Sequence, residues 1–160
     1  MSFLKTLFGA REGWDLIPDN ITEQFREKMS VAQFEQFTKL CIKYDIFPQM
    51  SRALNSEMQK IALVSFLTNV GNGIAQAYEQ SNDRRQEMLL EAIEFSKSVH
   101  LFDTDWYPAR IDLALMYMQL DRMEEAKEEA QKAISGMDRQ NDKSMRDKMV
   151  KISNGQKINI

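Results

Sequence analysis

The sequence predicts an all-α fold, a stack of antiparallel helix pairs with extra helices at the N-terminal end and a capping helix at the C-terminal end. Apolar residues recur at helical spacing along most of the 160 residues, and no segment shows the period of two that marks a half-buried strand. A short motif also repeats, because Ile74–Tyr78 (IAQAY) returns 39 residues later as Leu113–Tyr117 (LALMY). In both copies a large apolar residue, a small residue and a tyrosine share one helix face, as expected where paired helices pack on a neighbour.

Composition narrows the class of protein. The chain is long enough to bury a core as one domain, and 43% hydrophobic with 28% charged residues is an ordinary globular balance. The formal net charge of -3 gives no general attraction to nucleic acid, so we expect no nucleic-acid partner. The single cysteine, Cys41, cannot form an internal disulfide, and neither a secretory signal nor an apolar run of membrane-spanning length is visible. We therefore expect a soluble, cytoplasmic protein.

We expect residues 1–20 to form a short helix and a loop, followed by a single helical domain over residues 21–160. The short helix covers Ser2–Phe8, and its seven residues are marginal for an isolated helix. The loop over residues 9–20 contains glycine and proline. Its large apolar residues are expected to pack down as anchors: Trp14, Leu16 and Ile17.

Two helices are expected next. The first covers Ile21–Met29, where apolar residues stand four apart. Ser30 then begins the second helix as an N-cap, and Gln33 completes a capping box. We expect Phe47–Pro48 to end this segment, since the residue before a proline disfavours helix. One apolar stripe at helical spacing follows the second helix: Val31, Phe34, Phe37, Leu40, Cys41 and Tyr44.

A long central helix is expected from a second capping box, Ser56 with Gln59, to about Gln80. Its first half is apolar on most sides, which predicts a central position in the fold. Gly71 and Gly73 lie inside it, and each costs about 1 kcal/mol relative to alanine. The two glycines indicate a kink, a break in the helix, or a place where another helix comes close.

Two further helices follow the turn and cap at Asn82–Asp83. The second of them starts at Asp103–Asp105, tolerates Pro108 in its first turn and ends near Leu120. The first has a buried face made of Leu89, Ala92, Ile93, Ser96 and Val99.

The C-terminal part predicts two more helices. Asp121, with Glu124 at the box position, is expected to cap a helix that runs to Ser135, where Gly136 serves as a C-terminal cap. A last helix covers about residues 142–153, and residues 153–160 are expected to fray. Its apolar face is formed by Met145, Met149 and Ile152.

Residues 107–140 resemble a tetratricopeptide repeat, a 34-residue helix-turn-helix unit. That family places a large residue, a small residue and an aromatic residue in its first helix, as Leu113, Ala114 and Tyr117 stand here. It places small residues in its second helix, where Ala126 and Ala133 have the family's spacing. The chain departs from the pattern at three positions, where tryptophan, an aromatic residue and proline are usual: Arg110, Ala130 and Asp138.

A degenerate first unit covers about residues 68–106. Its motif Ile74–Tyr78 matches, but Ala92 follows Tyr78 by fourteen residues instead of nine, so an insertion of about five residues is required. The resemblance covers about residues 68–140 and implies a tetratricopeptide-like α-solenoid. Residues 21–60 could add a further degenerate repeat, and the polar outer side of the last helix suits a cap.

Few residues indicate chemistry. His100 is expected at a helix C-terminus, where the helix dipole favours it, and Cys41 lies on an apolar stripe as a buried, inert residue. Gly71–Gly73 lacks the spacing of a phosphate loop, and no zinc-ligand pattern is present. We therefore expect a protein that is not an enzyme and has no cofactor, catalytic residue or metal site. Glutamates and lysines three and four apart predict a solvated outer helix face: Glu124–Lys127 and Glu128–Lys132.

The resemblance implies a concave surface, lined by the first helix of each unit, that binds a peptide or helix of a partner protein. Asparagine and glutamine could bond a peptide backbone there, while apolar residues could seat a side chain. The expected function is a protein-interaction scaffold whose partner the sequence does not name. The implied groove residues are Asn69, Asn72, Gln76 and Glu79 in the first unit and Ile111, Leu115, Met118 and Gln119 in the second.

Two alternatives stay open. Small acidic repeat proteins of this length resemble secretion-type chaperones, which hold a cognate unstable protein. Alternatively, the helix Ser2–Phe8 could attach the protein to a membrane surface, although packing of that helix on the stack is favoured. The inserting residues would be Phe3, Leu4, Leu7 and Phe8. The oligomeric state does not follow from the sequence.

Overall fold

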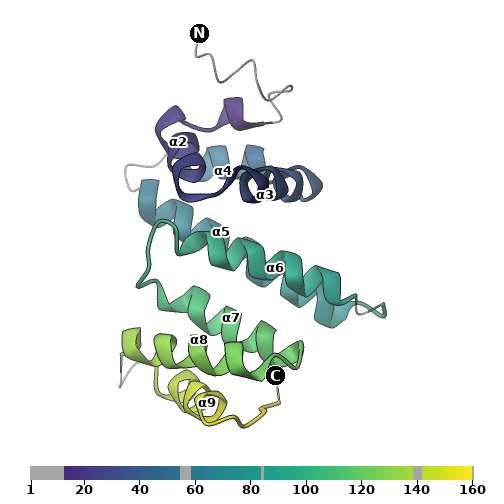
Figure 1. The fold of residues 1–160 in the computed structure, drawn as a ribbon, viewed down its shortest axis with the longest axis vertical. Coiled ribbons are helices and arrows are strands. Elements are labelled where there is room, and N and C mark those ends of the chain that lie inside the picture. The colour runs from purple at the N-terminus through teal and green to yellow at the C-terminus, as the bar shows by residue number, and fades with distance from the viewer. Residues whose placement is uncertain (1–12, 55–58, 84, 139–141, 160) are drawn as a thin grey trace. The chain divides into compact units, whose positions relative to one another are not determined.

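The computed structural model describes residues 13–54, 59–83, 85–138 and 142–159. Within these residues the protein is all-α and contains no strand (Figure 1). The expected helix Ser2–Phe8 and the cap residue Ser56 lie outside the described residues. The described elements are η1 (Trp14–Leu16), α2 (Asp19–Lys28), α3 (Val31–Lys43), α4 (Ile46–Leu54), α5 (Gln59–Gln80), α6 (Gln86–Val99), α7 (Tyr107–Gln119), α8 (Met123–Gly136) and α9 (Lys143–Ser153).

The chain divides into two compact units, which we call the N-terminal unit (residues 1–66) and the C-terminal unit (residues 67–160). The boundary falls within helix α5, inside the region that the sequence assigns to one domain. Each unit has its own buried residues, so each is described by itself.

Aromatic rings form the core of the N-terminal unit. The Trp14 ring stacks on Phe34, with 4.9 Å between centroids, and meets Phe25 and Phe47 edge-on. Its indole Nε1–H donates to the Thr38 hydroxyl over 2.8 Å, so the polar edge of the ring is satisfied inside the core. Trp14 is therefore the residue around which η1, α2, α3 and α4 meet.

The loop before α2 is partly as expected. Trp14 and Ile17 are buried anchors, but Leu16 is 49% exposed, so the prediction for Leu16 is wrong. All three residues lie at η1, whose single turn directs neighbouring side chains to different sides. Gly13 has φ +98°, and a Cβ atom there would lie 2.3 Å from the Phe47 ring, so both conformation and space require glycine.

Helix α3 begins at the predicted capping box. The Ser30 hydroxyl accepts from the Gln33 N–H, and the Gln33 side chain accepts from the Ser30 N–H. The expectation that Phe47–Pro48 ends this segment is wrong, because α3 ends at Lys43 and Asp45 breaks the helix with φ 51°. Pro48 lies in the first turn of α4, where backbone N–H groups have no acceptor within the helix, so proline loses no hydrogen bond there.

Gly71 marks a close helix approach. Helix α5 runs without interruption from Gln59 to Gln80, so no break occurs at the glycines. A Cβ on Gly71 would lie 2.5 Å from the Ser96 hydroxyl and 3.0 Å from the Ala92 carbonyl, both on α6. Gly73 has no neighbour within 4 Å of such an atom. The sequence left open a kink, a break or a close helix contact at the glycines, and the structure shows the close contact at Gly71.

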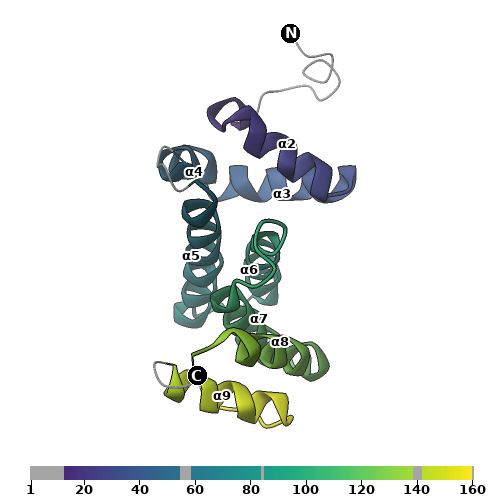
Figure 2. The ribbon, with the colours of Figure 1, turned by 90° about the vertical axis from the view of Figure 1, so that its left-hand side faces the viewer.

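Small residues dominate the core of the C-terminal unit. Helices α6, α7, α8 and α9 pack on one another in chain order, and Figure 2 shows α7, α8 and α9 in successive layers. The expected buried face of α6 is confirmed, since Leu89, Ala92, Ile93, Ser96 and Val99 are all buried. Alanines with no exposed surface bring the backbones close together: Ala92, Ala109, Ala114, Ala126, Ala130 and Ala133.

The expected N-caps of α6 and α8 are wrong. Arg85 and Arg122 stand at the N-caps of α6 and α8, and neither side chain caps its helix. Asp121 has φ 59° and forms the turn between α7 and α8 instead. Aspartate favours both N-caps and left-handed turn positions, so the residue type alone does not separate the two roles.

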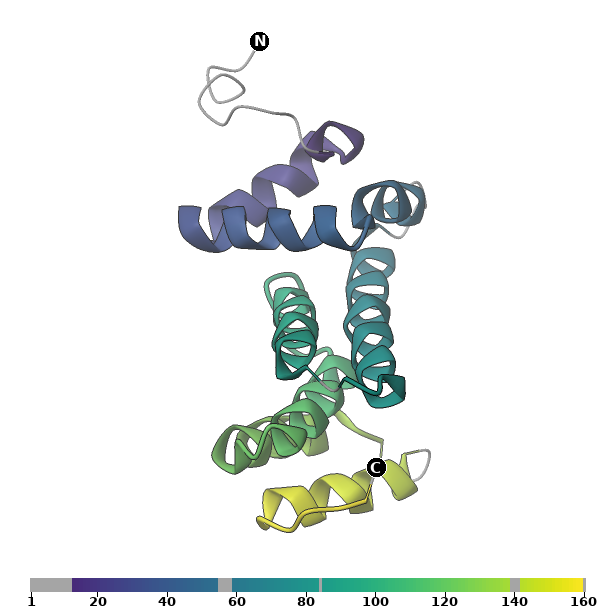
Figure 3. The ribbon, with the colours of Figure 1, turned by 90° about the vertical axis from the view of Figure 1, so that its right-hand side faces the viewer.

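Residues 154–159 after α9 contact the rest of the unit, so the expectation that they fray is wrong, while Ile160 lies outside the described residues. Gly155 has φ +79°, and the Gln156 N–H donates to the Lys151 carbonyl over 2.9 Å, which closes the end of the helix. Figure 3 shows the chain then returning from α9 toward the end of α5. Lys157 pairs with Asp121, and the Ile158 N–H donates to the Met118 sulfur over 3.4 Å.

Candidate partner-binding face

The predicted groove residues lie on α5 and α7. On α5, Asn69, Gln76 and Glu79 are exposed and Asn72 is half-buried. On α7, the side chains of Ile111, Leu115 and Gln119 are half-buried, and Met118 is buried. We call these eight residues the α5–α7 face.

The two rows of this face are adjacent at their C-terminal ends. The Gln119 Nε2 donates to Glu79 Oε1 over 2.8 Å, which joins α7 to α5 across forty residues of sequence. The Gln119 Oε1 is buried and has no hydrogen-bond partner among the described residues. On α5, Gln76 donates to Asn72 over 3.0 Å. The face therefore offers amide groups along α5 and apolar side chains along α7.

Asp112 belongs to the same side of α7, although the sequence prediction did not include it. It stands one helical turn before Leu115 and two turns before Gln119, so the three side chains share a face. Burial raises the pKa of Asp112 to about 7. A carboxyl in this setting favours a neighbouring cation, because a positive charge would offset the cost of its desolvation.

A cavity of about 550 Å³ lies at the C-terminal end of the face. Three of the residues that line it were predicted as groove residues, namely Glu79, Met118 and Gln119. The sequence prediction missed the others, because they come from the packed copy of the motif and from the segment after α9. These are Tyr78, Lys157, Ile158 and Asn159.

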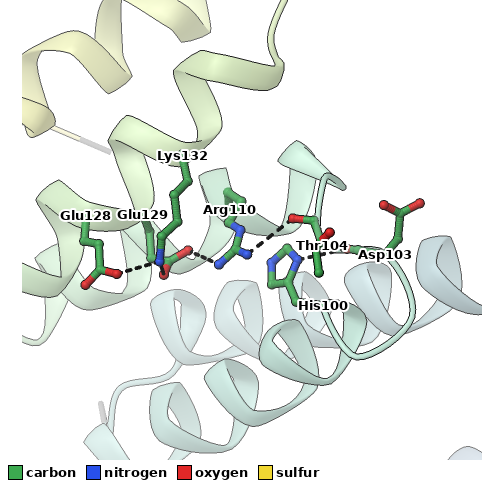
Figure 4. Close-up of polar contacts among 7 residues, drawn as sticks. All are labelled: His100, Asp103, Thr104, Arg110, Glu128, Glu129 and Lys132. Carbon is green, nitrogen blue, oxygen red and sulfur yellow. Dashed lines mark hydrogen bonds and ion pairs between the residues drawn. The ribbon is translucent and has the colours of Figure 1, made fainter. Parts of the chain in front are cut away.

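A second polar cluster joins α7 to α8 (Figure 4). The Arg110 guanidinium donates to Glu129 over 2.7 Å and to the Thr104 carbonyl over 3.3 Å. Lys132 bonds both Glu129 and Glu128. The Arg110 and Glu129 side chains are only 16% and 12% exposed, so this ion pair is partly desolvated. Each partner has a second contact, Arg110 with the Thr104 carbonyl and Glu129 with Lys132. The cluster fixes the loop before α7 against α8.

His100 lies beside the Arg110 guanidinium in this cluster (Figure 4). Its Nδ1 lies 3.1 Å from the Asp103 carbonyl, which favours a proton on Nδ1. Burial, followed by the positive charge of Arg110, lowers the pKa of His100 below its usual value. The imidazole is therefore neutral at pH 7, and its Nε2 is buried without a hydrogen-bond partner in the described chain. The expected position at a helix C-terminus is confirmed, since His100 is the C-cap of α6.

Cys41 is buried in α3, as expected, and burial raises the pKa of its thiol. A protonated thiol without access to solvent is a poor nucleophile. Among the described residues, no group of three or more His, Cys, Asp or Glu side chains could hold a metal ion. The expected pairs Glu124–Lys127 and Glu128–Lys132 are present on the outer side of α8.

Comparisons add no family. No protein-family model matches the chain, and no curated protein or solved structure is detectably similar to it. In the part of the chain that the structure describes, every helix is too short or too polar to cross a membrane. The candidate function therefore depends on the site geometry.

Proposed function

We propose that the C-terminal unit is a tetratricopeptide-like protein-interaction module that binds a peptide or helix of a partner protein on the α5–α7 face. The observation that supports this proposal is the hydrogen bond between Gln119 and Glu79, because it brings the C-terminal ends of the two predicted rows together. Interfaces of this kind combine amide groups that meet a peptide backbone with apolar positions that seat its side chains. The α5–α7 face has both.

Binding is a better fit to the structure than catalysis. A catalytic centre needs a nucleophile or an acid–base pair within reach of a substrate. Cys41 is buried, and His100 has a buried Nε2 in a ring that is kept neutral first by burial and then by the charge of Arg110. We accordingly propose a scaffold role without a cofactor. A cytoplasmic location is likewise proposed, from the single cysteine.

Selection from a random peptide-display library tests the proposed function. We expect selected peptides to bind the wild-type chain and to lose at least tenfold in affinity on Leu115→Glu, since a charge would replace an apolar seat on the face. The matched control is Leu90→Glu, which introduces the same charge at a 45% exposed leucine of α6 and is expected to leave affinity unchanged.

A second variant guards against misfolding. Leu115 is half-buried, so circular dichroism must first show that Leu115→Glu is folded. The double variant Asn72→Ala/Gln76→Ala alters the rim of α5, where the two side chains bond each other, and is expected to weaken the same peptides. Undiminished binding by both folded variants would contradict the proposed face.

A further inference from the structure

The segment after α9 covers the C-terminal end of the α5–α7 face. It leaves the helix at the left-handed Gly155 and continues without helix or strand through Asn159. Lys157, Ile158 and Asn159 line the 550 Å³ cavity opposite Glu79 and Gln119. A non-helical stretch of this chain therefore lines the end of the face where the proposed function places a partner peptide.

The contacts of this segment resemble those of a bound peptide. The Lys157 ammonium pairs with the Asp121 carboxylate, and the Ile158 backbone N–H donates to the Met118 sulfur over 3.4 Å. A charged side chain and a main-chain donor thus meet helix α7, as they do when an extended peptide is recognised by a preformed surface. Asp121, Met118 and Gln119 are consecutive or nearly so at the end of α7.

The charge of the surroundings selects for a basic occupant. Glu79 lines the cavity, Asp112 lies along the same side of α7, and Asp121 follows that helix. Among the described residues that line the cavity, the one cation is Lys157. Removing this segment would leave carboxylates without that positive charge, so a replacement should bring its own lysine or arginine.

The segment is held weakly enough to be displaced. The Lys157 and Asp121 side chains are 65% and 75% exposed, and such exposed pairs contribute little to stability because water and salt screen them. The thioether sulfur of Met118 is a weak acceptor. The buried Gln119 Oε1 accepts no hydrogen bond from the described residues, so the segment leaves one strong acceptor of the face unused.

We propose that Gln156–Asn159 is an intramolecular occupant of the partner site, and that the partner is an extended peptide in which a lysine or arginine precedes a branched aliphatic residue. This inference depends on the proposed function of the α5–α7 face. The partner's basic side chain replaces Lys157 at Asp121, its aliphatic residue replaces Ile158, and one of its backbone N–H groups donates to Gln119 Oε1. Partner binding and self-occupation then exclude each other.

Linkage to the same chain makes this competition substantial. A segment tethered by a short turn has an effective concentration on the order of 1 mM, so even a weak intramolecular contact competes with a dilute external peptide. Weakening the segment's own contacts is therefore expected to raise the affinity for an external peptide. A face that is free in the native chain would show no such gain.

The test uses a fluorescein-labelled synthetic peptide of residues 154–159 (NGQKIN) and the full chain. We expect its Kd, measured by fluorescence anisotropy, to be at least tenfold lower for Lys157→Glu/Ile158→Asp than for wild type. Adding Asp121→Lys to the double variant is expected to reverse the gain, because the peptide's lysine would then meet a cation. The control is Lys148→Glu, which makes the same lysine-to-glutamate change as at position 157 but at an exposed position of α9.

The outcomes separate this inference from the proposed function. Equal affinity of the peptide for wild type and the double variant, or binding to neither, overturns the intramolecular occupant. If library-selected peptides still lose affinity on Leu115→Glu in that case, the proposed function stands alone. If the double variant binds the peptide more tightly than wild type while Leu115→Glu changes nothing, Gln156–Asn159 is supported as the occupant, and the wider α5–α7 face is not.

Discussion

The two units of this chain build their cores in opposite ways. The N-terminal unit gathers large rings around Trp14, whose neighbours include Phe25, Phe34 and Phe47 within about 5 Å between centroids. The C-terminal unit relies on fully buried alanines and on Gly71, where a helix backbone approaches another directly. One core is filled by side chains, and the other by close backbones.

This difference predicts opposite sensitivities to substitution. A core of large rings loses most when a ring is removed, since the surroundings collapse only partly into the cavity. A core of small residues loses most when a side chain is enlarged, since no space exists to receive it. Each unit also contains one tryptophan, Trp14 or Trp106, so replacing the other tryptophan with phenylalanine gives a background in which fluorescence reports on one unit alone.

The largest effect is expected from Trp14→Ala. It removes the ring at the centre of the N-terminal unit and leaves the buried Thr38 hydroxyl without its donor. We expect a loss of about 3–5 kcal/mol in the free energy of unfolding of that unit, measured by urea titration with circular dichroism. Trp106 fluorescence should keep its wild-type midpoint; a matching shift there would mean that the two cores unfold as one.

A pair of glycine variants on α5 tests the small-residue core. Gly71→Leu places a side chain against Ser96 and the Ala92 carbonyl, and should destabilise the C-terminal unit by about 1–3 kcal/mol. Gly73→Ala meets no atom within 4 Å and should stabilise by about 0.5–1 kcal/mol through helix propensity. Thermal unfolding followed by Trp106 fluorescence measures both. Similar shifts of the same sign would contradict the close approach at Gly71.

Asp112→Asn is expected to stabilise the C-terminal unit to an extent that depends on pH. The folded-state pKa of about 7 lies above the ordinary value of 3.8, so the folded protein binds the proton more readily and its stability falls as pH rises across that interval. Asparagine does not titrate. We expect Asp112→Asn to be about 1–2 kcal/mol more stable than wild type at pH 8 and nearly equal at pH 4, a figure reduced for the partial exposure of the carboxyl.

Urea titrations at pH 4, 6 and 8 measure this difference. The gain should follow Trp106 fluorescence and leave the Trp14 signal unchanged, because Asp112 lies in the C-terminal unit. A gain that is the same at every pH would show that packing, and not titration of the carboxyl, is responsible.

A small loss of stability is expected from Ser30→Ala at the capping box of α3. Losing the hydroxyl leaves the Gln33 N–H without its acceptor and should cost about 1 kcal/mol. Ser30→Thr retains the hydroxyl and should cost less. Trp14 fluorescence during thermal unfolding reads both variants. An alanine variant as stable as wild type would show that packing of α3, and not its cap, determines where the helix begins.

The helices could be predicted from the sequence because their signals are local. The capping box at Ser30, the length of α5 and the buried face of α6 each follow from residues within a few turns of one another. The positions where the helices break were harder to predict. Asp45 and Asp121 both take φ values near +55°, and no nearby residue requires this.

The candidate site was predictable only in part. The rows on α5 and α7 follow from helical spacing and a family register, but their adjacency depends on the contact between Glu79 and Gln119. The segment at Lys157–Ile158 carries no local pattern, and its contacts with Met118 and Asp121 join residues 36 and 40 apart in sequence. Asp112 was not among the implied groove residues, and its burial could not be foreseen because a lone carboxylate on a helix is ordinarily solvated.

Because Cys41 is buried, the reaction rate of its thiol measures how often the N-terminal unit opens. This thiol can meet a disulfide reagent only when α3 opens, so the rate of labelling in native buffer reports the free energy of that opening. With one cysteine in the chain, every modified molecule records the same event. Adding the NGQKIN peptide during labelling would then show whether occupation of the C-terminal unit is felt at Cys41.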